Sequence, residues 1–357
     1  MVSYDILEHG QPLQARLRET PRPTGREVLV RITHCGVCHS DVHFWKGYFD
    51  LGGGKKARLA DRGLKPPMTL GHEPLGMVDA LGPAALGVEV GDKRLVYPWL
   101  GCGACWACEK GLTTLCVTPK AIGIALPGGF ATHLLVPDAK YLVPTDGIED
   151  AFASTLACSG VTSYSAVNKL LAHVHDGDWI AIIGCGGLGL LAIAILAGLG
   201  FQRIIACDVD EAKLDAAATQ GAAKTYCSDQ VASPATLAEL AGGRLGGVID
   251  FVGRTQTFDL SYPALRRGGA YVLVGLHGGD VQIPLPPIAQ RGISILGSYV
   301  GTLDEMVAVV DLARSGKLRP TPVALRLPQD VNSALEELEN NTSQARTVLD
   351  LATVQAE

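Results

Sequence analysis

Four cysteines lie within fifteen residues of one another, with two, two and seven residues between them. Four thiolates at such spacing can converge on one tetrahedral metal ion, most often zinc. A packed core has no need of four thiols in so short a stretch. Because four thiolates leave no open coordination position, the sequence predicts a structural zinc site that takes no part in catalysis. Its expected ligands are Cys102, Cys105, Cys108 and Cys116.

A second reactive stretch lies earlier in the chain and reads Cys35-Gly-Val-Cys38-His39-Ser40-Asp41-Val-His43. Its Cys-x-x-Cys pair could by itself be a redox pair or half of a zinc site. A thiol, a hydroxyl, a carboxylate and two imidazoles within six residues favour an active-site loop instead. When this run is considered by itself, the alternative is that its Cys and His side chains are packed together by chance and have no function.

A glycine-rich turn, Gly184-x-Gly186-x-x-Gly189, follows a β-rich run and precedes a helical pattern. A turn at such a junction lets backbone N–H groups and a helix N-terminus face a pyrophosphate. Asp208 comes nineteen residues after Gly189 and ends the next β-rich run. Its carboxylate can accept hydrogen bonds from an adenosine ribose and would repel a 2′-phosphate, so the sequence predicts NAD in preference to NADP.

Composition places the chain among globular proteins of two ordinary domains, with 357 residues, 47% hydrophobic and 18% charged. The net charge of −6 without a long Lys/Arg run argues against a nucleic-acid partner. Residues 179–202 carry no charge, but their central glycines favour a buried strand, turn and helix over a membrane span. The first residues lack the pattern of a signal peptide, so we expect a cytoplasmic protein.

The elements that must position these groups fall into two patterns. Residues 160–300 alternate strands and helices, which predicts a doubly wound parallel α/β sheet. Residues 1–159 read as short strands with turns. After Gly301 the pattern predicts helix until a last β-rich run begins at Arg346. We therefore expect one domain from 1–159 and 301–357, with the zinc lobe at 97–118, and a second from 160–300. The strands expected in the second domain are 179–183, 203–207, 224–227, 247–251, 270–274 and 293–296.

Three motifs in one order resemble the zinc-dependent medium-chain alcohol dehydrogenases: Cys38-His-Ser-Asp, Gly71-His72-Glu73 and the four-cysteine lobe, all ahead of a nucleotide domain. The resemblance covers nearly the whole chain. It implies a mostly-β GroES-like catalytic domain beside a Rossmann domain that binds NAD. It also implies a catalytic zinc on Cys38, His72 and Cys158, in addition to the structural zinc. Two thiolates and a neutral imidazole would leave its fourth position open.

The resemblance implies a reversible reaction in which an alcohol gives an aldehyde or ketone and NAD gives NADH. Ser40 would take the alcohol proton, pass it through the cofactor ribose, and His43 would deliver it to solvent. Asp41 matches the carboxylate that orients the metal-bound histidine. Glu73 is expected near the metal.

Lys213 matches the lysine that joins Asp208 at the adenosine ribose, and Arg346 matches an arginine that reaches the pyrophosphate. His39 is expected beside the phosphates. We expect a small-molecule partner, no nucleic acid or membrane, and a homodimer or homotetramer. The remaining expected cofactor contacts are Thr162, Gly184, Gly186, Gly187, Leu188, Gly189 and Val274.

The sequence leaves two alternative functions open. A polyol- or aldehyde-oxidising member of the same superfamily is one, and a non-catalytic zinc- and nucleotide-binding relative is the other. The chain departs from the usual pattern between Gly47 and Lys65, a stretch longer than is typical by roughly ten residues. One hypothesis is that this stretch forms a lid or a wall of the substrate pocket. The other is that it is a surface loop or a contact between subunits. Trp45 and Trp99 are either pocket walls or core residues.

Overall fold

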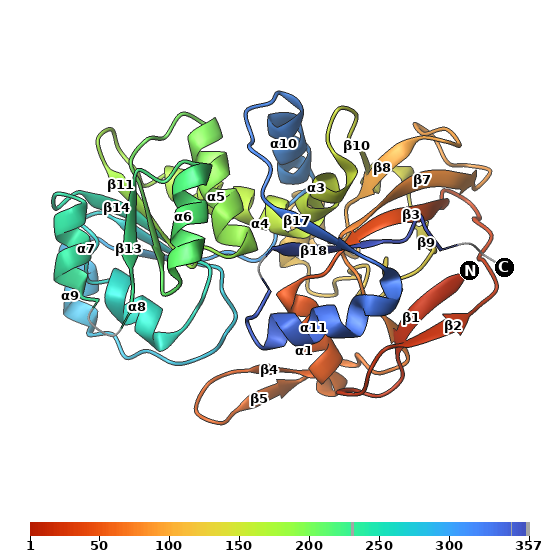
Figure 1. Ribbon diagram of the computed structural model, residues 1–357, viewed down its shortest axis with the longest axis horizontal. Helices are drawn as coiled ribbons and strands as arrows, with labels where there is room; N and C mark the ends of the chain where they lie inside the picture. Colours follow the sequence, from red (N-terminus) through yellow and green to blue (C-terminus); the bar gives the residue numbers. More distant parts are fainter. Residues whose placement is uncertain (230–231, 344, 355–357) are drawn as a thin grey trace.

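The computed structural model describes residues 1–229, 232–343 and 345–354. Figure 1 shows two lobes, with a sheet flanked by helices on the left and a strand-rich lobe on the right, where both termini lie. The helix-flanked lobe is built from the middle of the chain, and the strand-rich lobe is built from its two ends.

Six parallel strands form the sheet of the first lobe in the order β13-β12-β11-β14-β15-β16. The chain forms β11, β12 and β13 in turn toward one edge of the sheet. It then crosses back beside β11 and forms β14, β15 and β16 in turn toward the other edge. This change of direction creates a switch point at the carboxyl ends of β11 and β14, where such sheets bind ligands. All six expected strands are present within two residues of their predicted bounds: β11 Trp179–Ile183, β12 Ile204–Asp208, β13 Lys224–Cys227, β14 Leu245–Asp250, β15 Ala270–Leu273 and β16 Ser294–Gly297.

Both faces of this sheet are covered because its strands are apolar on both sides. In β11, Ile180 and Ile182 pack into one core cluster, whereas Ala181 and Ile183 pack into another on the opposite face. Helices α4 to α6 contribute to the first cluster, and α7 to α9 to the second. These helices are α4 Val161–Leu171, α5 Gly187–Gly198, α6 Glu211–Gln220, α7 Pro234–Leu240, α8 Thr255–Ser261 and α9 Leu285–Arg291.

The strand-rich lobe contains a seven-stranded sheet in the order β10-β8-β7-β3-β18-β17, with β9 also paired to β3. The last β-rich run, β18, pairs antiparallel with β3, so the chain returns to the strand-rich lobe in which it began, as predicted. A smaller sheet has the order β2-β1-β6. The strands are β1 Val2–Ile6, β2 Gln14–Leu17, β3 Val28–Gly36, β6 Met68–Thr69, β7 Pro74–Leu81, β8 Lys93–Val96, β9 His133–Val136, β10 Leu142–Pro144, β17 Val323–Arg326 and β18 Arg346–Asp350.

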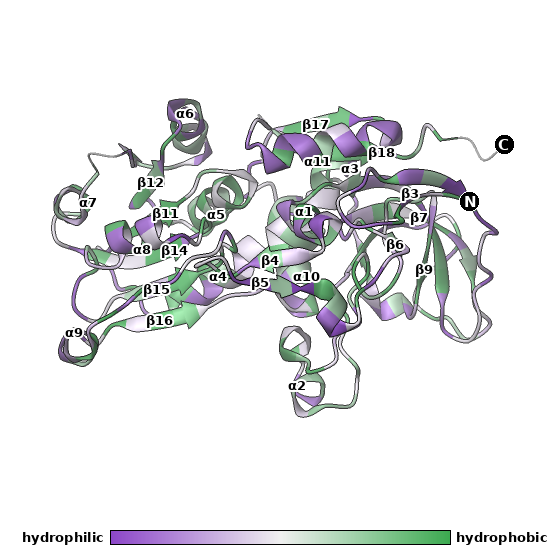
Figure 2. Ribbon diagram, turned by 90° about the horizontal axis from the view of Figure 1, so that it is seen from below, coloured by the Kyte–Doolittle hydropathy of each residue, from purple (hydrophilic) through white to green (hydrophobic). Residues whose placement is uncertain are grey.

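Strand β17 differs from the prediction of helix between Gly301 and β18. Its four residues are partly exposed and make no alternating apolar pattern, and only parallel pairing with β18 makes them a strand. The helices of this lobe are α1 His39–Lys46, α2 Trp106–Glu109, α3 Asp150–Thr155 and α11 Val331–Glu339. Helix α10, Leu303–Arg314, packs against α4 and α5 of the other lobe. The short α2 protrudes from the body of the molecule in Figure 2.

The long stretch after α1 folds into a hairpin of β4, Tyr48–Asp50, and β5, Lys56–Arg58. A single 3-10 turn, Leu59–Arg62, follows it. Gly47 ends α1 with a φ of 79°, in the left-handed conformation that glycine adopts without strain.

One continuous apolar cluster joins the two lobes, since Val30 of β3 and Ile182 of β11 belong to it. In the described part of the chain, no helix is long and apolar enough to cross a membrane.

Candidate active site

Helix α1 positions the first group of predicted site residues. Cys38 is its N-cap, and the Asp41 carboxylate accepts a hydrogen bond of 2.9 Å from the Cys38 backbone N–H through Oδ2. The other oxygen, Oδ1, lies 3.1 Å from Nδ1 of His72. Asp41 and His72 are both fully buried. One carboxylate therefore holds the thiol-bearing residue and the imidazole in a fixed relation, with Nε2 of His72 turned away from Asp41.

Cys158 reaches the same place from a π-helical turn, Leu156–Gly160, between α3 and α4. Such turns widen the helix locally and are frequent at functional sites. The sulfurs of Cys38 and Cys158 are 3.9 Å apart, close to the roughly 3.8 Å that two thiolates have on tetrahedral zinc. Nε2 of His72 is buried without a hydrogen-bond partner. Two thiols and an orphaned imidazole nitrogen within 4.8 Å of one another fit a zinc ion.

A buried ion pair lies directly behind this cluster. Glu73 is 0% exposed and pairs with Arg346 of β18. Glu73 belongs to the same group of potential metal donors, and its Oε2 is buried without a hydrogen-bond partner. This oxygen occupies the space that a side chain on Gly36 would need. Burial raises the pKa of Glu73 to about 7, although the Arg346 charge opposes this rise.

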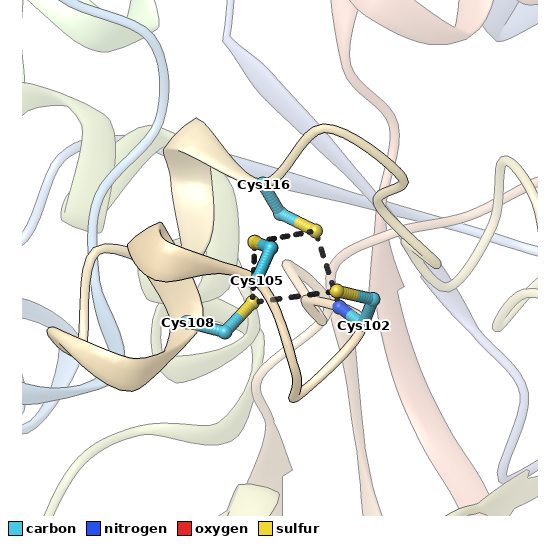
Figure 3. A group of neighbouring side chains, drawn as sticks. All are labelled: Cys102, Cys105, Cys108 and Cys116. Carbon is cyan, nitrogen blue, oxygen red and sulfur yellow. Dashed lines mark hydrogen bonds between the residues drawn. The ribbon is translucent and has the colours of Figure 1, made fainter.

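The four cysteines of the α2 lobe lie together, as Figure 3 shows. Their closest sulfurs are 3.6 Å (Cys105 to Cys108), 3.9 Å (Cys105 to Cys116) and 4.0 Å (Cys102 to Cys108) apart. A backbone hydrogen bond from Ala104 lowers the pKa of Cys102 to about 6, which favours the thiolate form. These distances and four soft donors fit a tetrahedral zinc without an open position.

The three glycines of the glycine turn meet different physical requirements. Gly184 has a φ of 87°, and a Cβ on Gly189 would lie 1.9 Å from the carbonyl oxygen of Gly184. A Cβ on Gly186 would meet no atom within 4 Å, because that position faces open space. Gly186 is also the N-cap of α5 and supplies no side-chain cap. The first N–H groups of α5 are thus free to bind an anion such as pyrophosphate.

Asp208 supports this turn from the end of β12. Its Oδ2 accepts a 2.7 Å hydrogen bond from the Cys185 backbone, and its Oδ1 accepts a 3.1 Å bond from Asp210. Each oxygen keeps a second lone pair that can accept a ribose hydroxyl. Lys213, in the first turn of α6, borders the same space.

A single cavity of about 580 Å³ connects the glycine turn with the cysteine and histidine cluster. All eleven predicted cofactor contacts line it, together with Ser40, His43, Cys38 and Cys158. His72, Asp41 and Glu73 are buried behind the cavity wall. The lining cofactor candidates are His39, Thr162, Gly184, Gly186, Gly187, Leu188, Gly189, Asp208, Lys213, Val274 and Arg346.

Histidine rings gather at one wall of the cavity. The ring of His39 lies 5.5 Å from that of His43 and 5.4 Å from that of His277. Burial lowers the pKa of His43 to about 4, so this imidazole is neutral across the physiological range. His277 was given no role from sequence, because a single histidine after β15 carries no local signal that it meets α1 across the cavity.

Bulky, mostly apolar side chains line the same cavity as Cys38 and Cys158: Phe44, Phe49, Trp99, Ile124, Leu276 and Tyr299. Of the two tryptophans considered from sequence, Trp99 is a cavity wall. Trp45 is not among the lining residues, and it packs in the core with its indole N–H donating to Gln11. Val300 also lines the cavity, with a φ of 46° that is unusual for a β-branched residue.

Comparison with known proteins agrees with this arrangement. Residues 24–147 match the alcohol dehydrogenase GroES-like domain, and residues 187–315 match the zinc-binding dehydrogenase domain. An NAD-dependent alcohol dehydrogenase from Sulfurisphaera tokodaii is 35% identical over 98% of this chain and 99% of its own. One from Saccharolobus solfataricus is 34% identical with the same coverage. The alcohol dehydrogenase structure from Aeropyrum pernix superposes with a TM-score of 0.87 at 31% identity, covering 98% of this chain and 100% of that one. Because likeness of this extent spans both lobes, the chain belongs to the zinc-dependent medium-chain alcohol dehydrogenase family.

Proposed function

We propose that this chain catalyses reversible hydride transfer between an alcohol and NAD, giving an aldehyde or ketone and NADH, with two zinc ions per chain. One observation carries the proposal. The glycine turn and the Cys38–Cys158 pair line one and the same cavity. A dinucleotide and a metal-held alcohol would therefore meet in the same space.

Cys38, His72 and Cys158 would hold the catalytic zinc, and Cys102, Cys105, Cys108 and Cys116 the structural one. The N-terminus of α5 would bind the pyrophosphate, beside Arg346 and His39. Asp208 and Lys213 would hold the adenosine ribose. Thr162 and Val274, both nearly buried in the cavity wall, would confine the nicotinamide end. When bound, zinc lowers the pKa of the alcohol hydroxyl and NAD accepts the hydride.

The side chains of this site would orient the metal ligands and move one proton. Asp41 fixes the His72 ring through Nδ1, so that Nε2 points toward the two thiols. Ser40 borders the cavity next to Cys38, where its hydroxyl can accept the alcohol proton. His43, neutral because of its lowered pKa, is an acceptor that can deliver the proton to solvent. The apolar walls exclude water from the reacting carbon.

The lining of the cavity bears on the alternative of a polyol substrate. A polyol needs several polar partners, because each desolvated hydroxyl that lacks a hydrogen bond loses binding energy. Here the wall beside the metal cluster is aromatic, since the ring of Trp99 lies 5.3 Å from that of His72 and 6.1 Å from that of Tyr299. This favours a simple alcohol with an apolar substituent over a polyol.

We further propose that residues 1–159 with 301–357 and residues 160–300 are the two domains, and that the protein is a homodimer or homotetramer. Strand β16 is an edge of its sheet, and Ile295 on it is 42% exposed. Pairing of this edge with a second copy would satisfy its free backbone groups and cover this side chain. Ten free cysteines, six of them in the two clusters, fit a reducing compartment such as the cytoplasm.

The decisive experiment combines metal analysis of the pure protein with NADH formation from primary, secondary and aromatic alcohols. Two zincs per chain and turnover with NAD are expected. Cys158→Ala should lose one zinc and the activity while keeping the fold, as measured by circular dichroism. A protein with two zincs that oxidises none of these alcohols with either dinucleotide would contradict the proposal, and so would a fully active Cys158→Ala variant.

A further inference from the structure

The hairpin β4–β5 leaves the catalytic lobe and touches the nucleotide-binding lobe. A Cβ on Gly52, at the tip of this hairpin, would lie only 2.7 Å from Cα of Gly279 and 3.0 Å from its backbone N and C. A Cβ on Gly278 would likewise lie 2.6 Å from the carbonyl oxygen of Asp50. Two backbones therefore pack directly on each other, which only glycine permits. Figure 1 shows the hairpin extending from α1 beneath the neighbouring lobe.

Each side of this contact is anchored in its own lobe. At the base of the hairpin, Leu59 is 1% exposed and its N–H donates to Gly47 at 2.9 Å. On the other side, the hydroxyl of Thr255 donates to the carbonyl of Asp280 at 2.9 Å. The glycine contact thus bridges the two lobes whose residues line the cavity, so loosening it would let the lobes move apart around a bound dinucleotide.

The hairpin also places Phe49 in the cavity wall. Its ring lies 4.7 Å from that of His43 and packs edge-on against Phe44 at 5.8 Å. Phe49 is half-buried and lines the same cavity as Cys38, Cys158 and Trp99. Between Phe49 and the glycine contact there are only two residues, so a shift of the tip must move the ring.

We propose that the hairpin is a clasp between the two lobes, and that Phe49 is a specificity-determining wall whose position the contact between Gly52 and Gly279 sets. The same contact then controls two properties, the size of alcohol that the cavity accepts and the rate at which NADH leaves. The selectivity part rests on the proposed function. The NADH part rests only on dinucleotide binding.

Neighbouring glycines of the same turn provide a matched control. Gly52 and Gly54 have φ values of 80° and 76°, so alanine at either position meets the same backbone strain. Only Gly52→Ala collides with Gly279, because a Cβ on Gly54 meets nothing within 4 Å. Any difference between the two variants therefore reports the contact between the lobes and not the strain in the turn.

The first measurement is NADH release, followed by stopped-flow fluorescence when excess NAD displaces bound NADH from the zinc-loaded protein. Gly52→Ala should release NADH faster than Gly54→Ala by about fivefold, because opening of such elements often limits release. Gly278→Ala, which pushes against Asp50 from the other side, should behave like Gly52→Ala. Equal release rates in Gly52→Ala and Gly54→Ala would overturn the clasp.

The second measurement is the ratio of kcat/KM for cyclohexylmethanol to that for ethanol. Phe49→Ala should raise this ratio about tenfold. Removing the phenyl ring makes room in the cavity for the cyclohexyl group and leaves ethanol with fewer contacts to the wall. Leu51→Ala, an exposed residue of the same hairpin, should leave it unchanged. Gly52→Ala should shift the ratio in the direction of Phe49→Ala. An unchanged ratio in Phe49→Ala, with a wild type that oxidises both alcohols, would overturn the specificity role.

The two measurements separate this inference from the proposed function. A wild type that oxidises no alcohol contradicts the proposed function and the specificity role, while faster NADH release from Gly52→Ala would still support the clasp. If the wild type oxidises alcohols but Gly52→Ala and Gly54→Ala behave identically in both measurements, the proposed function is supported and the clasp is contradicted.

Discussion

The carboxylate of Asp41 lies 3.1 Å from Nδ1 of His72, and both side chains are fully buried. The contact joins α1 to the segment just before β7, thirty-one residues later in the chain. It selects the tautomer of His72 in which Nε2 carries the lone pair, as a metal ligand requires. The same carboxylate also accepts a hydrogen bond from the Cys38 N–H. A single buried group thus orients two of the three proposed ligands.

Replacing Asp41 by Asn should weaken the proposed catalytic zinc site. Asn keeps the size of the side chain but loses the charge that holds the imidazole, so we expect the affinity for this zinc to fall about 10- to 100-fold. Competition with a chromophoric chelator measures the change. The zinc of the four-cysteine lobe should be retained, and Asp61→Asn, on the exposed turn after β5, serves as the control. Unchanged affinities for both zincs would contradict the role of Asp41.

Cys105→Ala should remove the zinc of the α2 lobe without removing the one at Cys38. Three thiols bind zinc far less tightly than four, and this lobe has little apolar core of its own, since Trp106 and Leu115 are 60% and 56% exposed. The melting temperature should therefore fall by several degrees and one zinc should be lost. Cys227→Ala, which removes a thiol outside both clusters, is the control. If Cys105→Ala keeps two zincs and its full stability, the assignment of a structural site is wrong.

Asp208→Asn should relax the discrimination between NAD and NADP. The amide keeps an oxygen that can accept the hydrogen bond from Cys185, but it no longer repels a 2′-phosphate. Removing one charge at close range should raise the NADP to NAD ratio of kcat/KM about tenfold. Steady-state kinetics with both dinucleotides tests this, with Asp215→Asn on the outer face of α6 as the control. A ratio that stays at the wild-type value would show that Asp208 does not face the ribose.

Acid should destabilise the fold in part through His277. Burial and the Arg254 charge lower its pKa to about 4, from an ordinary value of 6.5. Between these values the unfolded chain binds a proton that the folded chain does not, so the free energy of unfolding falls as pH falls from about 6.5 to 4. His277→Asn should show a smaller fall.

Urea unfolding at pH 7 and pH 4.5, with the zinc content measured in each sample, checks this prediction. Because the zinc ligands titrate equally in both proteins, the difference between wild type and His277→Asn isolates the histidine. His43, whose pKa is also about 4, should leave part of the pH dependence in the variant. Parallel curves for the two proteins would contradict the prediction.

Sequence reasoning succeeded where the signal is local. The strands of the parallel sheet could be located because each is a short apolar run between turn residues, and both faces of the sheet demand apolar side chains. The cysteine lobe could be recognised because its four thiols need only short loops to converge. Strand β17 was missed for the opposite reason, since nothing but its partner β18 makes it a strand.

By itself, the sequence determined which donor atoms and which glycine turn the chain possesses, and the order in which they occur. The tertiary structure alone decided that Arg346 pairs with Glu73, that His277 approaches His39, and that Phe49 faces the cavity. These pairs are joined by sheet pairing and by the packing of two lobes, over separations that no local pattern encodes. Contacts of this kind depend on the free energy of the whole fold, whereas the spacing within a metal loop or a glycine turn is set by the covalent chain.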